Sequence, residues 1–348
     1  MSGFSVYLGE KTDYKYIQSM IDIGYKTVFT SLQIPEEDTT TCYQQLSDLL
    51  YHFQHDQLTF IIDVNPSKLN HSFYQLLSEY PHGNYVIRLD QFTSLDLIKE
   101  FTAKGFYCCL NASTISRDLL NQLSPIDNFK NIVYCHNYYP RPDTGLNDVF
   151  VKQQNQLIRE FNPQATIYGF ISGTEKRGPL FKGLPTLEAN RKSHPIFSAQ
   201  HLIDTEINHV IVGDIQLQLL EAKRLYKAIH QRHFTLTITL TQDSNANRQL
   251  INAVHTVRYD GPESVIRSQE ARSILNDTVT PAYCYKREVG SITIDNCLNG
   301  RYEGELQIIK DPLPSHPHVN CVGMVSEKDL EVLNCLSSND TFDFAVET

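Results

Sequence analysis

Eight short apolar runs divide the first two thirds of this 348-residue chain, and segments with helical spacing separate them. The runs are FSVYLGE, YKTVFTS, LTFIIDVNP, YVIRLDQ, GFYCCLNAS, NIVYCHN, ATIYGFISG and HVIVGDIQ. Because each run is apolar throughout rather than alternating, it predicts a strand covered on both faces, as in a parallel sheet. Eight strand–helix units predict an α/β fold, a (β/α)8 TIM barrel. An open doubly wound sheet is the alternative, but no GxGxxG or GxxxxGK[ST] motif follows a strand.

The character of the chain changes after a last helical segment that ends near His230. Further strand-like runs follow without long helices between them, separated by Gly, Pro, Asn and Asp: HFTLTITLT, HTVRYDGPESVIRS, SITIDNC and ELQIIKDPLP. This pattern is typical of a small β-barrel or β-rich domain. We therefore expect a catalytic barrel over residues 1–231 and a smaller β-rich domain over residues 232–348, with the final NDTFDFAVET as a loose tail.

The composition argues against several classes of partner. The formal net charge of −10 disfavours a general nucleic-acid or anionic-membrane surface. No targeting segment precedes the first run, and no apolar run approaches the roughly 18 residues that span a bilayer, so we expect a cytoplasmic protein. The eight cysteines are scattered without CxxC or HExxH spacing, and we expect neither a metal nor a cofactor. The oligomeric state is left open.

Acidic residues follow several of the predicted strands. In a TIM barrel the chemistry takes place at the C-terminal ends of the strands, where the βα loops converge. The candidate catalytic carboxylates there are Glu10, Asp63, Asp90 and Asp214. Each has an alternative role as a helix N-cap or an ion-pair partner, and Asp63 and Asp90 have Arg88 close by in sequence. We expect at least two of the four to be catalytic.

Two long loops follow the sixth and seventh strands, HNYYPRPDTGL (136–146) and GTEKRGPLFKGLPTLEANR (173–191). Their arginines, Arg141, Arg177 and Arg191, are suited to bidentate recognition of a phosphate or carboxylate. Tyr138 and Tyr139 are suited to stacking on a sugar ring, and packing is their alternative role. The alternative for the arginines is pairing with the nearby acids Asp143, Glu175 and Glu188. Together the loops predict a site for an anionic carbohydrate.

These motifs, with YLGE, IIDVNP, IRLDQF, LNAST and VGD, and with HTVRYDGPESVIRSQEAR and RYEGELQIIKDPLP in the last third, resemble the bacterial 6-phospho-N-acetylmuramidases. The resemblance runs from about Phe4 to Met324 and implies a TIM barrel joined to a cyclophilin-like β-domain. It implies cytoplasmic hydrolysis of the β-1,4 bond in N-acetylmuramic acid 6-phosphate–N-acetylglucosamine, a disaccharide recovered during peptidoglycan recycling. The candidate substrate-binding residues are Asn111, His136, Asn137, Tyr139, Arg141, Ser172, Arg177, Glu188, Arg191 and Arg267.

The sequence leaves several assignments open. Glu10 and Asp214 follow neighbouring strands of a closed barrel, and so do Asp63 and Asp90. Either pair would serve a retaining or an inverting mechanism, and substrate-assisted catalysis by the N-acetyl group is a third alternative. His136 is expected to position the substrate rather than to react. Arg267 lies in the motif VIRSQEARS, where it is expected to touch the phosphate or to form an interdomain salt bridge. Two other classes remain as alternatives, a sugar-phosphate aldolase or isomerase and a non-enzymatic sugar-phosphate binding protein.

Overall fold

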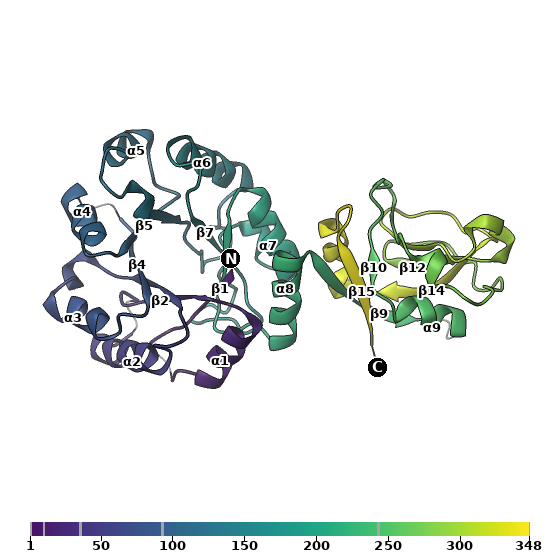
Figure 1. The fold of residues 1–348 in the computed structure, drawn as a ribbon, viewed down its shortest axis with the longest axis horizontal. Coiled ribbons are helices and arrows are strands. Elements are labelled where there is room, and N and C mark those ends of the chain that lie inside the picture. Colours follow the sequence, from purple (N-terminus) through teal and green to yellow (C-terminus); the bar gives the residue numbers. More distant parts are fainter. Residues whose placement is uncertain (1, 10, 35–36, 92–93, 242–243, 348) are drawn as a thin grey trace. The chain divides into compact units, whose positions relative to one another are not determined.

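The computed structural model describes residues 2–9, 11–34, 37–91, 94–241 and 244–347. They form two compact units, Met1–Tyr226 and Lys227–Thr348. In the first unit eight parallel strands close into a barrel, with β1 paired to both β2 and β8 (Figure 1). The strands are β1 (Ser2–Ser5), β2 (Thr27–Ser31), β3 (Thr59–Asp63), β4 (Asn84–Leu89), β5 (Tyr107–Asn111), β6 (Ile132–Cys135), β7 (Ile167–Ile171) and β8 (His209–Val212).

A helix follows each strand, and Figure 1 shows these helices as a ring around the barrel. They are α1 (Tyr14–Ile23), α2 (Thr39–His52), α3 (His71–Glu79), α4 (Leu95–Ala103), α5 (Arg117–Leu123), α6 (Asp148–Phe161), α7 (Pro195–Asp204) and α8 (Leu219–Gln231). Most begin at a side chain that accepts a hydrogen bond from the first turn, such as Asp38 before α2 and Asn147 before α6. Short 3-10 turns, η1 (Pro66–Lys68), η2 (Phe129–Asn131) and η3 (Glu188–Asn190), lie in the loops. The expected TIM barrel is confirmed.

The barrel interior is filled by side chains and is not a pore. Its buried cluster comprises Phe29, Ile61, Val86, Cys109, Val133, Cys135, Tyr168, Phe170 and Ile211. Successive side chains of a strand point to opposite faces, so the residues between these positions face the helices instead. This alternation decides which polar residues at the strand ends reach the mouth of the barrel.

The second unit is a mixed seven-stranded sheet with the order β10-β15-β9-β14-β12-β13-β11. Its strands are β9 (His233–Leu240), β10 (His255–Thr256), β11 (Val265–Arg267), β12 (Ser291–Asp295), β13 (Leu306–Ile309), β14 (Val319–Val325) and β15 (Thr341–Val346). The helical segments are α9 (Asn245–Ile251), α10 (Ala271–Ile274), η4 (Cys297–Tyr302) and η5 (Glu327–Cys335). This confirms a β-rich second domain.

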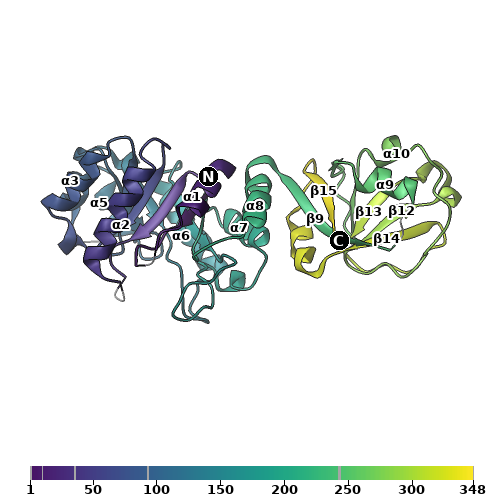
Figure 2. The ribbon, with the colours of Figure 1, turned by 90° about the horizontal axis from the view of Figure 1, so that it is seen from below.

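The expectation of a loose C-terminal tail is wrong. Thr341–Val346 forms β15, which runs parallel to β9 from Thr341 opposite His233 to Val346 opposite Ile238, and Figure 2 shows the two strands side by side. Phe342 is fully buried, and this burial of apolar surface stabilises the strand. Among the described residues, no helix has the length and apolar character needed to cross a membrane.

Candidate active site

The barrel mouth begins with an apolar floor made of three aromatic rings. Tyr138, from the loop after β6, packs edge-on against Phe170 and Phe29, with ring centroids 5.2 Å and 6.1 Å away. Phe29 and Phe170 also contact each other edge-on at 5.0 Å. Such edge-to-face contacts fix ring orientation as well as excluding water. The floor therefore gives the polar groups above it a rigid, apolar base.

A polar layer lies directly above the apolar interior on β2 to β5. Because side chains alternate along a strand, the residue two positions beyond an inward apolar residue also faces inward. These residues are Ser31 after Phe29, Asp63 after Ile61, Arg88 after Val86 and Asn111 after Cys109. The polar layer therefore occupies the C-terminal mouth, where TIM barrels carry their active sites.

Arg88 is the centre of this layer. Its guanidinium donates from Nη1 to Asp63 and from Nη2 to Asp90, the latter over 3.0 Å, and it also donates to Asn137 Oδ1. Burial is the largest single influence and opposes the charge of Arg88, but Asp63 and the other groups around it together outweigh burial and raise the pKa of the guanidinium above its ordinary value. One cation therefore joins the ends of β3 and β4 and the loop after β6.

Asp63 and Asp90 differ in what their oxygens contact. Asp63 uses both, one with Arg88 and the other accepting from Ser31 Oγ at 2.9 Å, and its side chain is 10% exposed. Asp90 Oδ1 accepts from Arg88, from Asn137 Nδ2 at 3.1 Å and from Asn111 Nδ2 at 3.3 Å. Within the described part of the chain Asp90 Oδ2 has no hydrogen-bond partner, and the side chain is 41% exposed. Asp90 therefore presents an oriented, accessible oxygen, whereas Asp63 does not.

Asp90 lines a cavity of about 180 Å³. The cavity is lined by Phe29, Gln33, Asp63, Arg88, Asp90, Asn137, Tyr138 and Phe170. Burial raises the pKa of the Tyr138 phenol, which lies within electrostatic range of both Arg177 and Asp63. The site thus combines carboxylates, amides and an aromatic floor, a set suited to a sugar and to acid–base chemistry at a glycosidic bond.

Asp214 is placed differently from the other candidate carboxylates. It is fully buried, and its oxygens accept from three backbone N–H groups, those of Gly173 (2.9 Å), Arg177 (3.0 Å) and Leu184 (3.3 Å). Lys176 Nζ lies 3.7 Å from Oδ2. These contacts tie the loop after β7 to the end of β8, which favours a structural role. Glu10, its expected partner, lies outside the described residues.

Glu188 and Arg191 form a brace between the two long loops. Arg191 donates from Nε and Nη2 to the two Glu188 oxygens, both at 2.6 Å, and its remaining contacts are the carbonyls of Tyr139, Gly183 and Arg141. Glu188 also accepts from the backbone N–H groups of Asp143 and Gly145. Arg191 therefore pairs with a nearby acid, Glu188, which was the alternative to binding a substrate anion. Its guanidinium donors are satisfied by protein groups.

His136 is buried in the helix-facing layer. Its Nδ1 lies 2.8 Å from Ser113 Oγ and its Nε2 2.8 Å from Asn155 Oδ1 on α6. Burial lowers the pKa of His136 to about 4, so it is neutral at physiological pH. Strand alternation explains the placement, since Cys135 faces the barrel interior and His136 the opposite side. Both imidazole nitrogens are thus engaged by protein, and the expected contact of His136 with the substrate stays a prediction.

The remaining candidates divide between the mouth and the periphery. Asn111 and Asn137 hold Asp90, while Ser172 is buried and its hydroxyl donates to the Arg191 carbonyl at 3.4 Å. Tyr139, in the loop after β6, is half-buried. Arg141 is exposed after β6, and its guanidinium forms no ion pair within the described ranges.

Arg267 belongs to the second unit, on β11. It donates from Nε to Glu305 Oε1 at 2.7 Å and lies 3.7 Å from Asp260. Arg272 pairs with the other Glu305 oxygen at 3.2 Å. The Arg267 guanidinium therefore contacts two acidic residues of its own unit.

Two mouth residues were missed by reasoning from the sequence. Tyr7 continues the inward face of β1, and its ring lies beneath the Arg177 guanidinium, 4.1 Å from ring centroid to Cζ. Glu37, in the loop after β2, pairs with Arg177 at 3.0 Å. The alternation of side chains along β1 could have predicted that Tyr7 faces the mouth of the barrel. Nothing in the sequence pattern links Glu37 to a residue 140 positions away.

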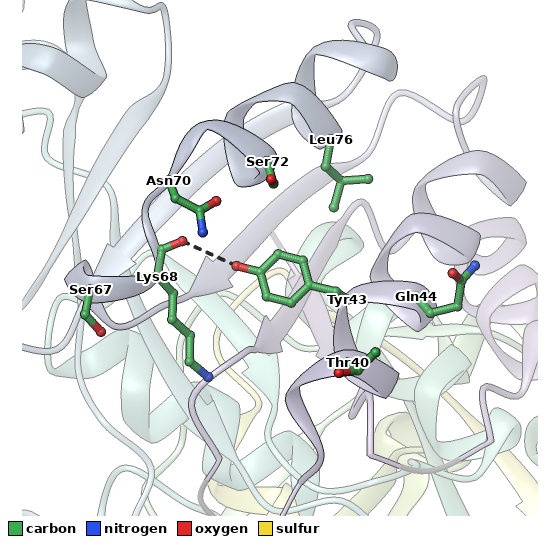
Figure 3. Close-up of a pocket in the computed structure, with 8 residues that line it drawn as sticks. All are labelled: Thr40, Tyr43, Gln44, Ser67, Lys68, Asn70, Ser72 and Leu76. Atoms are coloured by element: carbon green, nitrogen blue, oxygen red, sulfur yellow. Dashed lines mark hydrogen bonds between the residues drawn. The ribbon is translucent and has the colours of Figure 1, made fainter.

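A separate hollow of about 600 Å³ lies between the first turns of α2 and α3 (Figure 3). It is lined by Thr40, Tyr43, Gln44, Ser67, Lys68, Asn70, Ser72 and Leu76. Figure 3 shows the Tyr43 ring crossing it, with the hydroxyl donating to the Lys68 carbonyl at 3.4 Å. None of these described lining residues is a carboxylate, so the hollow lacks the acid–base groups of the central cavity.

Comparison with known proteins places the chain in a family. The family model "6-phospho-N-acetylmuramidase, N-terminal" matches residues 2–227, and the corresponding C-terminal model matches residues 234–345. No curated protein gives a significant match. A conserved protein of unknown function from Enterococcus faecalis has a similar structure, with a TM-score of 0.86, 28% identity, and coverage of 100% of this chain and 96% of that chain. An uncharacterized B. cereus protein has a TM-score of 0.76, 25% identity and 99% coverage of both chains. Since the two family models together cover nearly the whole chain, it belongs to the 6-phospho-N-acetylmuramidase family.

Proposed function

We propose that this protein hydrolyses the β-1,4 bond of N-acetylmuramic acid 6-phosphate–N-acetylglucosamine in the cytoplasm, during recycling of peptidoglycan. The family match supports the substrate class. The observation that carries the reaction type is Asp90, which lines the cavity; its Oδ1 is held by three donors, and its Oδ2 has no hydrogen-bond partner among the described residues. A fixed carboxylate with one accessible oxygen is what a glycosidase needs for a nucleophile or a base.

Asp90 is the carboxylate to which we assign attack on the anomeric carbon or activation of a water. Asp63 then acts through Arg88: it holds the guanidinium in place, and Arg88 keeps Asp90 oriented. The leaving oxygen needs a proton from a second group. Glu10 remains the candidate acid. Asp214 is better suited to fixing the loop after β7, because its oxygens are occupied by backbone donors.

The anionic groups of the substrate require cations at the mouth. Arg177 and Arg141 are suited to this role, since the donors of each are incompletely used within the described ranges. Arg191 is less suited because its guanidinium is satisfied by Glu188 and by backbone carbonyls. Arg267 is retained as a substrate-binding candidate of the second domain, although Glu305 and Asp260 already contact it.

The test incubates purified protein with the 6-phosphorylated disaccharide and with its unphosphorylated form, following the released sugars. We expect release from the phosphorylated form only. The Arg177→Ala variant is expected to lose much of this discrimination, and retained discrimination would move the phosphate site elsewhere. Inactivity on both disaccharides would contradict the proposed hydrolase function. NMR of the first-formed anomer would then separate retention from inversion.

A further inference from the structure

The Arg177 guanidinium is held on two sides before any ligand binds. Its Nη2 lies 3.0 Å from Glu37 Oε1, and its Cζ lies over the Tyr7 ring, 4.1 Å from the centroid. The Arg177 backbone N–H is fixed separately by Asp214 at 3.0 Å. The side chains of Arg177 and Glu37 are 16% and 10% exposed, so this is a largely desolvated ion pair rather than a surface contact.

Glu37 itself contacts Cys42 on the following helix and Gly9 after β1. Its Oε2 lies 3.5 Å from the Cys42 thiol on α2. Burial, and then Glu37, raise the pKa of Cys42 to about 11, so the thiol stays protonated and donates to the carboxylate. On its other side Glu37 crosses the face of Gly9, where an added Cβ would lie 2.4 Å from Glu37 Cγ. A side chain at residue 9 would therefore displace Glu37 from its present position.

Arg177 retains free hydrogen-bonding capacity in this arrangement. Of its guanidinium donors, Nη2 alone has a partner within the described residues, which leaves Nε and Nη1 available. A guanidinium held at one edge by a carboxylate and on one face by an aromatic ring can offer its remaining edge to a phosphate bidentately. Lys176, next in sequence, adds positive charge nearby while donating to the Gly173 carbonyl.

We propose that Glu37 is a positioning residue for phosphate recognition: with Tyr7 it holds Arg177 so that the free edge of the guanidinium receives the 6-phosphate of the substrate. This rests on the proposed function, which supplies the phosphate monoester. The carboxylate does not touch the ligand. Its effect is to restrict the long Arg177 side chain to one orientation, which lowers the entropy lost when the phosphate binds.

The role makes a prediction that a purely structural ion pair does not. Glu37→Ala frees Arg177 to move, so KM for the phosphorylated disaccharide is expected to rise about 10-fold, with kcat within about twofold of wild type. Glu37→Gln keeps a hydrogen-bond acceptor at the same place, so its KM is expected to stay close to that of wild type. Glu175→Gln is the control, because Glu175 is an exposed carboxylate in the loop that carries Arg177. This substitution is expected to leave KM unchanged.

Calorimetric titration with N-acetylglucosamine 6-phosphate measures the same effect without turnover. We expect weaker binding by Glu37→Ala and near-normal binding by Glu37→Gln. If Glu37→Ala fails to fold, Glu37→Asp takes its place, since its shorter side chain keeps the charge but not the reach. Tighter binding by both Glu37→Ala and Glu37→Gln would overturn the proposal, because Glu37 would then be competing with the phosphate.

The two hypotheses fail in different ways. If wild-type protein hydrolyses neither disaccharide, the proposed function fails. If wild type discriminates for phosphate but Glu37→Ala matches the Glu175→Gln control in KM and binding, the positioning role of Glu37 is wrong and the hydrolase function stands.

Discussion

Arg88 Nη2 donates to Asp90 Oδ1 across 3.0 Å, while the other Nη of the same guanidinium donates to Asp63. Two carboxylates on neighbouring strands therefore share one cation but are left in different states. Both Asp63 oxygens have hydrogen-bond partners and the side chain is 10% exposed, whereas the Asp90 side chain is 41% exposed and lines the cavity. This asymmetry follows from position along the chain: Asp63 ends β3, whereas Asp90 lies one residue beyond β4.

Asp90→Asn should nearly abolish hydrolysis. The amide keeps the shape of the side chain but removes the charge needed for attack on the sugar or for activation of water. We expect kcat for the phosphorylated disaccharide to fall by about 10³-fold or more, with KM changed little. Steady-state kinetics with a circular dichroism control for folding would measure this. An active Asp90→Asn variant would leave Glu10 and Asp63 as the carboxylates to examine by the same substitution.

Arg88→Lys should impair catalysis without removing positive charge. An ammonium cannot reach Asp63, Asp90 and Asn137 together as the planar guanidinium does, so Asp90 loses its fixed orientation. We expect kcat to fall by about 10- to 100-fold. Arg117→Lys is the matched control, because Arg117 pairs with Glu160 in an exposed ion pair. Equal kinetics for the two variants would show that Arg88 supplies charge alone.

The brace between the two long loops should weaken in acid. Hydrogen bonds from Arg191 lower the pKa of Glu188 from 4.5 to about 2. Because the folded-state pKa is depressed, this stabilisation is present above pH 4.5 and is lost as the pH falls through about 2. In the Glu188→Gln variant the free energy of unfolding should therefore decrease less than in wild type as the pH falls over this interval. Denaturant titration at each pH would measure this. An unchanged pH profile would mean that the pair contributes no net stability.

His136 should make the barrel sensitive to mild acid. Burial lowers its pKa from 6.5 to about 4, so the unfolded chain takes up a proton in an interval where the folded protein does not. Its contribution to stability is complete above pH 6.5 and is lost as the pH falls to about 4. Substitution by Gln, which does not titrate, should reduce the slope of thermal midpoint against pH in this interval. A slope equal to that of wild type would contradict the neutral, buried assignment.

Asp295 in the second unit should act with the opposite sign. Burial raises its pKa from 3.8 to about 6, so the folded unit favours the protonated form. The resulting stabilisation is present below pH 3.8 and is lost as the pH rises through about 6. Asp295→Asn should therefore gain stability relative to wild type as the pH rises across this interval. A constant difference between the two proteins would mean that Asp295 does not titrate there.

The alternation of apolar runs and helical segments by itself determined the barrel, because strands buried on both faces have few other ways to pack. It also placed Asp63, Asp90 and Asn111 at the mouth, since polar residues follow the inward-facing positions of those strands. The β-rich character of the second domain followed from its short strands and frequent turn residues. The C-terminal strand was missed because acidic residues interrupt its apolar ones in the sequence, although its backbone pairs with that of β9.

Only the tertiary structure decided which groups each charged side chain contacts. Arg177 and Arg191 look alike in sequence, yet one stacks on Tyr7 with donors to spare, and the other is satisfied by Glu188 and three carbonyls. Asp214 resembles Asp90 until backbone donors 30 to 41 residues away are seen to occupy its oxygens. Sequence pattern reports burial and periodicity, which are local. The partners of a charge depend on loops that converge only when the barrel closes, and those partners separate an accessible carboxylate from a structural one.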